Sequence, residues 1–402
     1  MNNRSGRRAR KKRRKKQENA SNEPFVDLRR WLKQKGFSSR SLIPASFSDT
    51  GRGLMATQPV KANELVISLP ERCLLTTTTV LKSYIGDYIK RWKPPVSPLV
   101  ALCSFLIAER HYGKAAEWSA YIQVLPKSYT CPVYFSDDIM DLLPPDVRQK
   151  PIEELFTVDA FRWAWCSVNT RTVYMEHTQS EFLSREKDVF ALAPYLDLLN
   201  HCPEVQVEAG FNRLTRCYEI RSAQGCTKYQ QAFICYGPHD NHQLLLEYGF
   251  VASRNPHSVV YVDLGTLKLC LDVSDKQLQQ KLLFLKDNSF LRNLTFGLDG
   301  PSWRLMTALK LLSLKPDQYS CWKSVLLGAP VSQDRKEWCL LNAQMLCQHL
   351  SNDNTDALER LTQMKAGADE ARLEQLCVIE NLRREERTIL EHSKQVLQSL
   401  LS

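Results

Sequence analysis

Two short stretches limit how this chain can fold, because each is an apolar run that leads directly into polar residues. The first, Ala193-Pro-Tyr-Leu-Asp-Leu-Leu-Asn-His201, ends in the adjacent polar pair Asn200 and His201. The second, Phe233-Ile-Cys-Tyr-Gly237, is a β-type run that ends in Tyr236 and Gly237. Polar side chains that enter a protein core need hydrogen-bond partners there. The pair Asn200 and His201 therefore predicts either a ligand-binding site or a hydrogen-bonded core pair.

A third motif lies near the start of the chain, where Gly51-Arg-Gly-Leu54 predicts a glycine-rich turn between two strands. Glycines let a backbone approach a ligand closely, because they carry no Cβ. A plain turn is the alternative for this motif on its own, so its meaning depends on the other two stretches.

Basic residues are concentrated at the start of the chain. The first sixteen residues hold ten of the 54 lysines and arginines and no acidic residue, which equals the net charge of +10. The rest of the 402-residue chain therefore carries 44 basic and 44 acidic residues, and a neutral body argues against a broad duplex-binding face. We predict a disordered basic tail over residues 1–23, with residues 7–16 recognised by the nuclear import machinery. A solubilising tail or a weak RNA contact is the alternative.

The cysteine pattern indicates the cellular compartment. Thirteen cysteines are scattered through the chain, without any CxxC or CxC spacing. This pattern predicts reduced thiols in a cytosolic or nuclear protein and no structural zinc. No run of eighteen apolar residues occurs, so we expect no membrane span.

Hydrophobic periodicity divides the remaining chain into a strand-rich first part and a helical last part. The first part is predicted to hold a helix over 25–35, short strands over 42–75, helices over 77–120 and 161–168, and strands again over 205–236. From about residue 265 the pattern is helical. It ends in a long amphipathic helix over 371–401, whose predicted apolar face comprises Leu376, Ile379, Leu382, Ile389, Val396 and Leu400.

The three motifs, in their order along the chain, resemble those of the SET-domain protein methyltransferases. The resemblance implies an α+β fold, in which a SET-domain β-fold with a helical insert is followed by an all-α C-terminal domain. It implies an N-terminal helical segment over 24–46 and a SET domain over 47–252, with a shortened helical insert at about 90–190. A helical domain over 258–398 resembles the Rubisco-methyltransferase-type substrate-binding domain. This pairing is typical of a branch that modifies lysine, or in one case histidine, in protein substrates.

The resemblance also implies a cofactor and the residues that bind it. S-adenosylmethionine, the methyl donor of the family, carries a sulfonium, a carboxylate and an ammonium, so its pocket needs mixed polar groups. The guanidinium of Arg171 suits a carboxylate, with an exposed surface arginine as the alternative. Aromatic faces near the lysine channel favour a methylated ammonium, with core packing as the alternative. The positions that match cofactor-binding residues of the family are Thr50, Gly51, Arg52, Arg171, Asp197, Asn200, His201, Tyr236, Tyr248 and Phe250.

The resemblance makes Tyr236 the candidate catalytic residue. A lysine amine must be neutral to attack a methyl group, yet free lysine has a pKa near ~10.4. Desolvation beside a sulfonium lowers that pKa, because both disfavour the ammonium. A tyrosine hydroxyl can then align the amine for in-line displacement, so that proximity and orientation supply much of the rate.

These observations together predict a protein-lysine N-methyltransferase that uses S-adenosylmethionine and no metal, in the nucleus and cytosol. Histones are the expected protein substrate, because of the nuclear-type tail. Three alternatives remain: an inactive SET-fold interaction protein, supported by the short insert; a protein-histidine methyltransferase; and an RNA-associated protein that works through its tail. Residues Thr172 and Val173, which follow Arg171, offer no side-chain amide to hold an imidazole, and this favours lysine.

Overall fold

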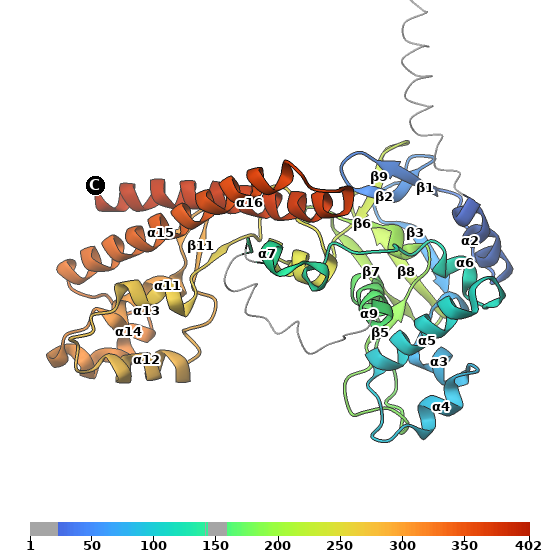
Figure 1. Cartoon of the computed structure of the whole chain (residues 1–402), viewed down its shortest axis with the longest axis horizontal. Coiled ribbons are helices and arrows are strands. Elements are labelled where there is room, and N and C mark those ends of the chain that lie inside the picture. The colour runs from blue at the N-terminus through green and yellow to red at the C-terminus, as the bar shows by residue number, and fades with distance from the viewer. Residues whose placement is uncertain (1–22, 141, 144–158) are drawn as a thin grey trace, which may run out of the picture. The chain divides into compact units, whose positions relative to one another are not determined.

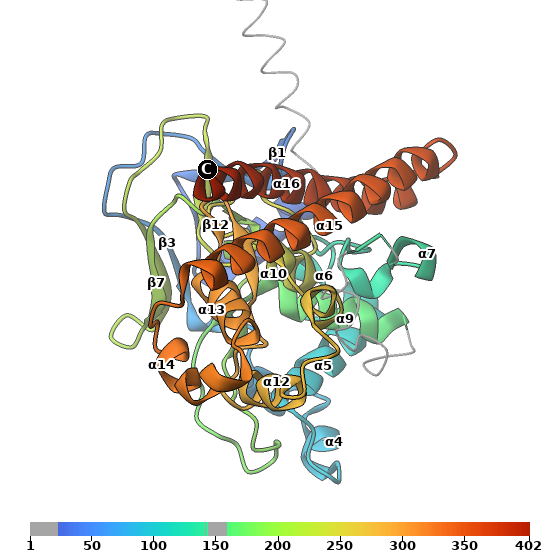
Figure 2. The ribbon, with the colours of Figure 1, turned by 90° about the vertical axis from the view of Figure 1, so that its left-hand side faces the viewer.

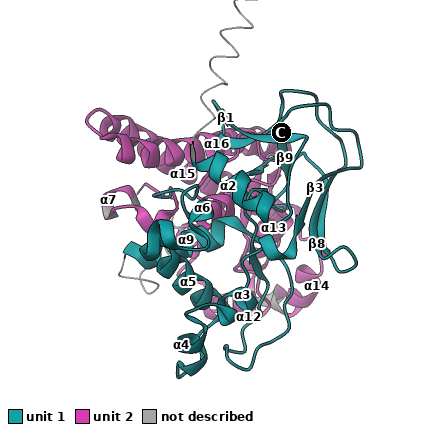
Figure 3. Ribbon diagram, turned by 90° about the vertical axis from the view of Figure 1, so that its right-hand side faces the viewer, with its two compact units in different colours: residues 1–129, 153–238 teal, residues 130–152, 239–402 magenta. Residues whose placement is uncertain are grey.

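The computed structural model describes residues 23–140, 142–143 and 159–402 (Figure 1). The chain separates into two compact units, one of residues 1–129 and 153–238 and the other of residues 130–152 and 239–402 (Figure 3). Residues 1–22 of the predicted basic tail, and residues 144–158 of the predicted insert, lie outside the described part of the chain.

The first unit combines short strands with helices. Its strands are β1 (Leu42–Phe47), β2 (Gly51–Ala56), β3 (Glu64–Pro70), β4 (Thr172–Tyr174), β5 (Phe190–Leu192), β6 (Asn200–His201), β7 (Val207–Asn212), β8 (Cys217–Ser222) and β9 (Gln231–Ile234). They form sheets of order β1-β2-β9-β6 and β3-β8-β7 and the pair β4-β5. Its helices are α2 (Glu23–Gln34), α3 (Thr77–Lys82), α4 (Gly86–Arg91), α5 (Pro98–Tyr112), α6 (Ser119–Ile122) and α9 (Asp159–Arg171).

Helix α5 shows how the sequence sets these boundaries. Ser97 caps its start by accepting a hydrogen bond from the backbone N–H of Val100 at 3.2 Å, and Pro98 occupies the first turn, where no N–H is needed. The helix ends at Gly113, whose φ of +62° suits a residue without a Cβ. Its buried residues join those of α2 and the sheets in one hydrophobic core.

The glycine motif near the start of the chain corrects one prediction. The turn between β1 and β2 is formed by residues 48–50, and the segment 51–53 begins strand β2 instead of forming the turn. Gly51 is the residue directly after the turn and has a φ of +68°, a conformation that a residue without a Cβ adopts easily. The glycines therefore correctly predicted a chain reversal, but the reversal lies a few residues earlier than predicted.

Strand β6 brings the two polar motifs together. It runs parallel to β9, so that Asn200 lies opposite Phe233 and His201 lies opposite Ile234. Parallel neighbours need a long connection, here through β7 and β8. Consequently the stretches that end in Asn200-His201 and Tyr236-Gly237 lie side by side at one end of the four-stranded sheet.

The second unit is mainly helical. Its helices are α7 (Asp137–Met140), α10 (Asn241–Gln243), the π-helical turn η6 (Leu244–Tyr248), α11 (Leu264–Leu267), α12 (Leu278–Asp287), α13 (Trp303–Leu312), α14 (Trp322–Leu326), α15 (Gln333–Lys365) and α16 (Glu370–Leu401). Figures 1 and 2 show α15 and α16 lying side by side as a long helical hairpin. The unit also holds a small sheet of β10 (Val260–Tyr261), β11 (Thr295–Gly297) and β12 (Gly300–Pro301), which the sequence did not reveal.

The predicted face of the last helix needs one correction. Leu376, Ile379, Leu382 and Ile389 are buried as predicted, whereas Leu400 is 53% exposed. In the last turns, Leu397 and Leu401 contact the core instead. The apolar face therefore shifts by one residue at the end of α16.

The predicted α+β fold with a helical last part is confirmed. Among the residues that the structure describes, no helix is both long and apolar enough to cross a membrane.

Candidate active site

Asn200, the first residue of β6, connects this strand to the hairpin of β1 and β2. Its side-chain N–H₂ donates to the carbonyl oxygen of Arg52 at 2.9 Å and reaches the carbonyl oxygen of Thr50 at 3.5 Å. A Cβ on Gly53 would lie 2.9 Å from this Asn200 nitrogen, so the second glycine of the motif leaves the space that the amide needs. Two motifs that lie about 150 residues apart in sequence therefore meet through one side chain.

A glutamine missed by the sequence analysis supports the same hairpin. Gln231, at the start of β9, exchanges hydrogen bonds with the hydroxyl of Thr50 at 2.6 Å and 2.8 Å. Thr50 is exposed, and the amide of Gln231 is its side-chain partner. No sequence pattern marked Gln231, because a polar residue at a strand start is ordinary.

Arg171 and Asp197 form a largely buried pair of opposite charges in the first unit. Arg171, at the end of α9, donates from Nη1 to the backbone oxygen of Asp197 at 3.1 Å and to its Oδ2 at 3.3 Å. Their side chains are 17% and 2% exposed, so the alternative of a surface arginine is wrong. The Nε of Arg171 and the Oδ1 of Asp197 are also buried, and among the described residues neither has a hydrogen-bond partner.

Neighbouring groups determine the charge states of this pair. Burial raises the pKa of Asp197, and Arg171 and the hydroxyl of Tyr121 offset part of the rise. Burial opposes the charge on Arg171, but Asp197 and nearby tyrosines outweigh it and raise the pKa of the guanidinium. One of these tyrosines is Tyr236, so the candidate catalytic residue lies within electrostatic reach of the pair.

Arg52 and Tyr121 complete the surroundings of Asp197. The guanidinium of Arg52 donates to the carbonyl oxygen of Val124 at 2.7 Å, and burial and then Arg171 lower its pKa. Tyr121, in α6, donates its hydroxyl to Oδ2 of Asp197 at 2.9 Å. The sequence analysis missed Tyr121, although a tyrosine inside an apolar stretch needs a partner for its hydroxyl.

The chain reaches Asp197 through an unusual backbone conformation. Tyr195 has a φ of +77°, which costs a residue with a Cβ on the order of 1–3 kcal/mol. The residue is held there by burial and by its hydroxyl, which donates to the carbonyl oxygen of Leu42 at 2.7 Å. The surrounding core thus fixes the turn that aims the next residues, including Asp197.

Tyr236 follows β9 and is fixed at two points. Its hydroxyl donates to the carbonyl oxygen of Leu199 at 2.7 Å, and its backbone N–H donates to Nδ1 of His201 at 3.1 Å. Because Nδ1 accepts, the imidazole of His201 is in the tautomer that carries its proton on Nε2. His201 is 8% exposed, and its ring centre lies 5.2 Å from that of Tyr236.

Tyr248 and Phe250 belong to the second unit. Tyr248 ends the π-helical turn, Gly249 follows with a φ of +76°, and the ring centres of Tyr248 and Phe250 are 6.3 Å apart. Single π-helical turns frequently accompany functional sites. The assignment of both rings to the cofactor site stays a prediction.

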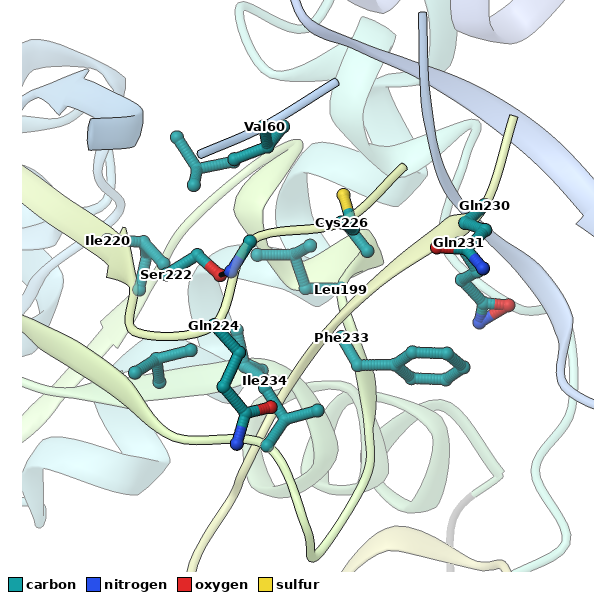
Figure 4. A pocket seen from close by; sticks show the side chains of 15 residues that line it. Val60, Leu199, Ile220, Ser222, Gln224, Cys226, Gln230, Gln231, Phe233 and Ile234 are labelled. Atoms are coloured by element: carbon teal, nitrogen blue, oxygen red, sulfur yellow. Dashed lines mark hydrogen bonds between the residues drawn. The ribbon is translucent and has the colours of Figure 1, made fainter. Parts of the chain in front are cut away.

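A cavity of about 340 Å³ lies against β8 and β9 (Figure 4). Its walls include Leu199, Cys226 and Gln231, but none of the predicted site residues. In the described part of the chain, no group of three or more His, Cys, Asp or Glu side chains could hold a metal ion.

Comparisons with known proteins identify the family. A model of the SET domain matches residues 51–237, and a model described as Rubisco LSMT substrate-binding matches residues 272–390. SET domain-containing protein 4 of Mus musculus is 48% identical over 406 residues, covering 94% of this chain and 92% of that protein. The Homo sapiens protein of the same name is 46% identical, with the same coverage.

The chain belongs to the SET-domain methyltransferase family. The resemblance inferred from the motifs is thus confirmed. A likeness to SET domain-containing protein 4 is also visible in the sequence, in Trp92-Lys-Pro-Pro95 and in Tyr236-Gly-Pro-His-Asp-Asn241, and the two matches confirm it.

Solved structures show the same SET fold. Rubisco LSMT bound to AdoMet matches with a TM-score of 0.61 at 18% identity, covering 94% of this chain and 92% of that chain. The SET domain of LSMT bound to lysine and AdoHcy matches with a TM-score of 0.60, also at 18% identity, over 94% and 91%.

More distant members of the SET family differ in the residue they modify. A ribosomal lysine N-methyltransferase of Schizosaccharomyces pombe is 28% identical over 72% of this chain and 74% of that protein. The actin-histidine N-methyltransferase of Homo sapiens is 27% identical over 61% of this chain and 45% of that protein.

Proposed function

We propose that this protein is an S-adenosylmethionine-dependent protein-lysine N-methyltransferase. The observation that supports the proposal most is the buried pair of Arg171 and Asp197, in which Nε and Oδ1 have no partner among the described residues. The amino-acid end of S-adenosylmethionine carries a carboxylate and an ammonium, which offer an acceptor to Arg171 and a donor to Asp197. The charges, burial and donor set of these residues therefore fit the cofactor.

Other residues would hold the cofactor from the hairpin side. Asn200 fixes the backbone of Thr50 and Arg52, and Gly53 leaves the room that the amide of Asn200 needs. When bound, the cofactor supplies an electrophilic methyl group on a sulfonium. The solved structures that share this fold hold AdoMet in one case and lysine with AdoHcy in another, which supports the same use of the site here.

Tyr236 would orient the amine of the substrate. Its hydroxyl proton is directed at the carbonyl oxygen of Leu199, and a phenolic oxygen that donates one hydrogen bond can still accept another. An N–H of the substrate amine can bond to this oxygen, which turns the nitrogen lone pair toward the methyl group. Tyr236 thus acts by orientation, and desolvation of the substrate ammonium favours loss of its proton.

Lysine is the proposed target residue. The SET family includes both lysine and histidine enzymes, so the family alone does not decide the question. Directly after Arg171 come Thr172 and Val173 in β4, and neither carries the side-chain amide that would hold an imidazole. We propose histones as protein substrates, in the nucleus and cytosol, on the basis of the basic run over residues 7–16 alone.

The test is transfer of a labelled methyl group by the purified full-length chain. The protein is incubated with methyl-labelled S-adenosylmethionine and core histones or nuclear extract, beside Tyr236→Phe and Tyr218→Phe. We expect the wild type to label lysine, as located by mass spectrometry, and Tyr236→Phe to lose about a hundredfold in rate because the amine is misaligned. Tyr218→Phe removes a buried hydroxyl elsewhere, in β8, and should retain most of the rate.

Other results would change the assignment. Label on histidine would replace lysine by histidine as the target. Cofactor binding without label on any protein would favour the inactive interaction protein. An undiminished rate in Tyr236→Phe would remove Tyr236 from the chemistry.

A further inference from the structure

Tyr121 is a buried polar residue to which the proposed function gives no role. It lies in the short helix α6, and its side chain is fully covered by the core of the first unit. Its hydroxyl donates a hydrogen bond across 76 positions of sequence, to Oδ2 of Asp197 at 2.9 Å. A tyrosine that served packing alone could satisfy its hydroxyl on any backbone carbonyl, as Tyr195 does on Leu42.

The hydrogen bonds of Asp197 are divided unequally between its two oxygens. Oδ2 accepts from the hydroxyl of Tyr121 and from Nη1 of Arg171 at 3.3 Å, whereas Oδ1 has no partner among the described residues. Rotation about χ2 of an aspartate is only weakly restricted, so an unrestrained carboxylate can turn and interchange the positions of Oδ1 and Oδ2. Two donors on one oxygen remove that freedom and leave the other oxygen facing the remaining side.

We propose that Tyr121 is a positioning residue that holds Asp197 with Oδ1 directed at the ammonium of the cofactor's amino-acid end. This inference rests on the proposed function. Tyr121 touches no reacting atom in this scheme and acts only through Asp197.

The choice of a tyrosine has a chemical reason. A second cation on Oδ2 would neutralise Asp197 and weaken its attraction for an ammonium, whereas a neutral hydroxyl fixes the carboxylate and leaves its charge available. Burial and the neighbouring carboxylate raise the pKa of Tyr121 well above its usual value, so it remains a donor at neutral pH. Its hydrogen bond also lowers the pKa of Asp197, against the rise that burial causes.

The proposal predicts a selective loss of affinity for ligands that carry the amino-acid end. The full-length chain and Tyr121→Phe are titrated with S-adenosylhomocysteine and with 5′-methylthioadenosine, which lacks the carboxylate and the ammonium. We expect Tyr121→Phe to lower the affinity for S-adenosylhomocysteine about tenfold, since one hydrogen bond to a charged group is lost. Affinity for methylthioadenosine should not change.

Two controls separate positioning from structural damage. Tyr218→Phe makes the same change at a buried tyrosine whose hydroxyl bonds a backbone oxygen, that of Tyr174, and it should leave the ratio of the two affinities unchanged. In an Asp197→Asn background, Tyr121→Phe should cause no further selective loss, because its effect passes through the carboxylate.

The outcomes distinguish this inference from the proposed function. If the wild type binds both ligands, and Tyr121→Phe lowers both affinities equally or changes neither, the positioning role is overturned. Failure of the wild type to bind S-adenosylhomocysteine would overturn the proposed function, and the role of Tyr121 with it.

Discussion

An arginine and an aspartate buried together are expensive to desolvate, with an effective cost of several kcal/mol for each ion. The pair of Arg171 and Asp197 recovers part of this cost through direct contacts at 3.1 Å and 3.3 Å. It leaves Nε and Oδ1 without partners among the described residues, so both atoms are available to a ligand. At the scale of single residues, this incomplete pairing is the strongest sign of a ligand site.

The raised pKa of Asp197 leads to a prediction about pH. Only the ionised carboxylate attracts an ammonium, so affinity for S-adenosylhomocysteine should fall as acidification protonates Asp197. Because burial raises this pKa, the fall should begin at a higher pH than the value near ~3.9 of an exposed aspartate would give. Dissociation constants measured by calorimetry from neutral to acidic pH check this. The neighbouring Arg171 and Arg52 stay protonated over this range, so they do not cause the change in affinity.

Asp197→Asn is the matched variant for this experiment. It should bind S-adenosylhomocysteine weakly at all pH values, and its affinity should vary less with pH than that of the wild type. The same pH dependence in both proteins would show that another group is responsible.

At the residue scale, motifs identified polar positions in the sequence, and the binding of a cofactor by these residues stays a prediction. Asn200, Arg171 and Asp197 follow recognisable motifs, and the structure places each of them in polar contacts within the first unit. Tyr121 and Gln231 were not predicted, because their partners, Asp197 and Thr50, lie 76 and 181 positions away in sequence. A hydrogen bond between side chains so far apart depends on tertiary packing, which local patterns do not encode.

At the scale of elements, periodicity predicted the long helices better than their ends. Helices α5 and α16 appear where apolar spacing placed them. The reversal near Gly51 was placed too late, because a glycine with positive φ can equally lie within a turn or just after one. The strands of the small sheet β10-β11-β12 have only two or three residues each, too few to show an alternating pattern.

The shifted face of α16 gives a stability prediction with a built-in control. Leu397 is fully buried and Leu400 is 53% exposed, and both lie in the last turns of the same helix. Leu397→Ala should lower the free energy of unfolding of the second unit by about 2–5 kcal/mol, because it leaves a cavity. Leu400→Ala should change it by no more than about 0.5 kcal/mol. Chemical denaturation of both variants tests this, and equal losses would contradict the assigned face.

At the scale of the whole molecule, the order of the motifs predicted the family but not how the chain brings them together. The parallel pairing of β6 with β9 places Asn200-His201 beside the segment that ends in Tyr236, across an excursion through β7 and β8. Strand pairing of this kind is a long-range property, because a two-residue strand carries almost no local signal. The resemblance to a family supplied what periodicity alone could not.

The central claim is that the first unit binds the amino-acid end of S-adenosylmethionine through Arg171 and Asp197. The most direct measurement is a calorimetric titration of the full-length chain with S-adenosylhomocysteine, beside the variant Arg171→Met. We predict saturable binding at one site in the wild type and a loss of about tenfold or more in the variant, since a charged hydrogen bond disappears. No binding to the wild type, or equal affinity in both proteins, would contradict the claim.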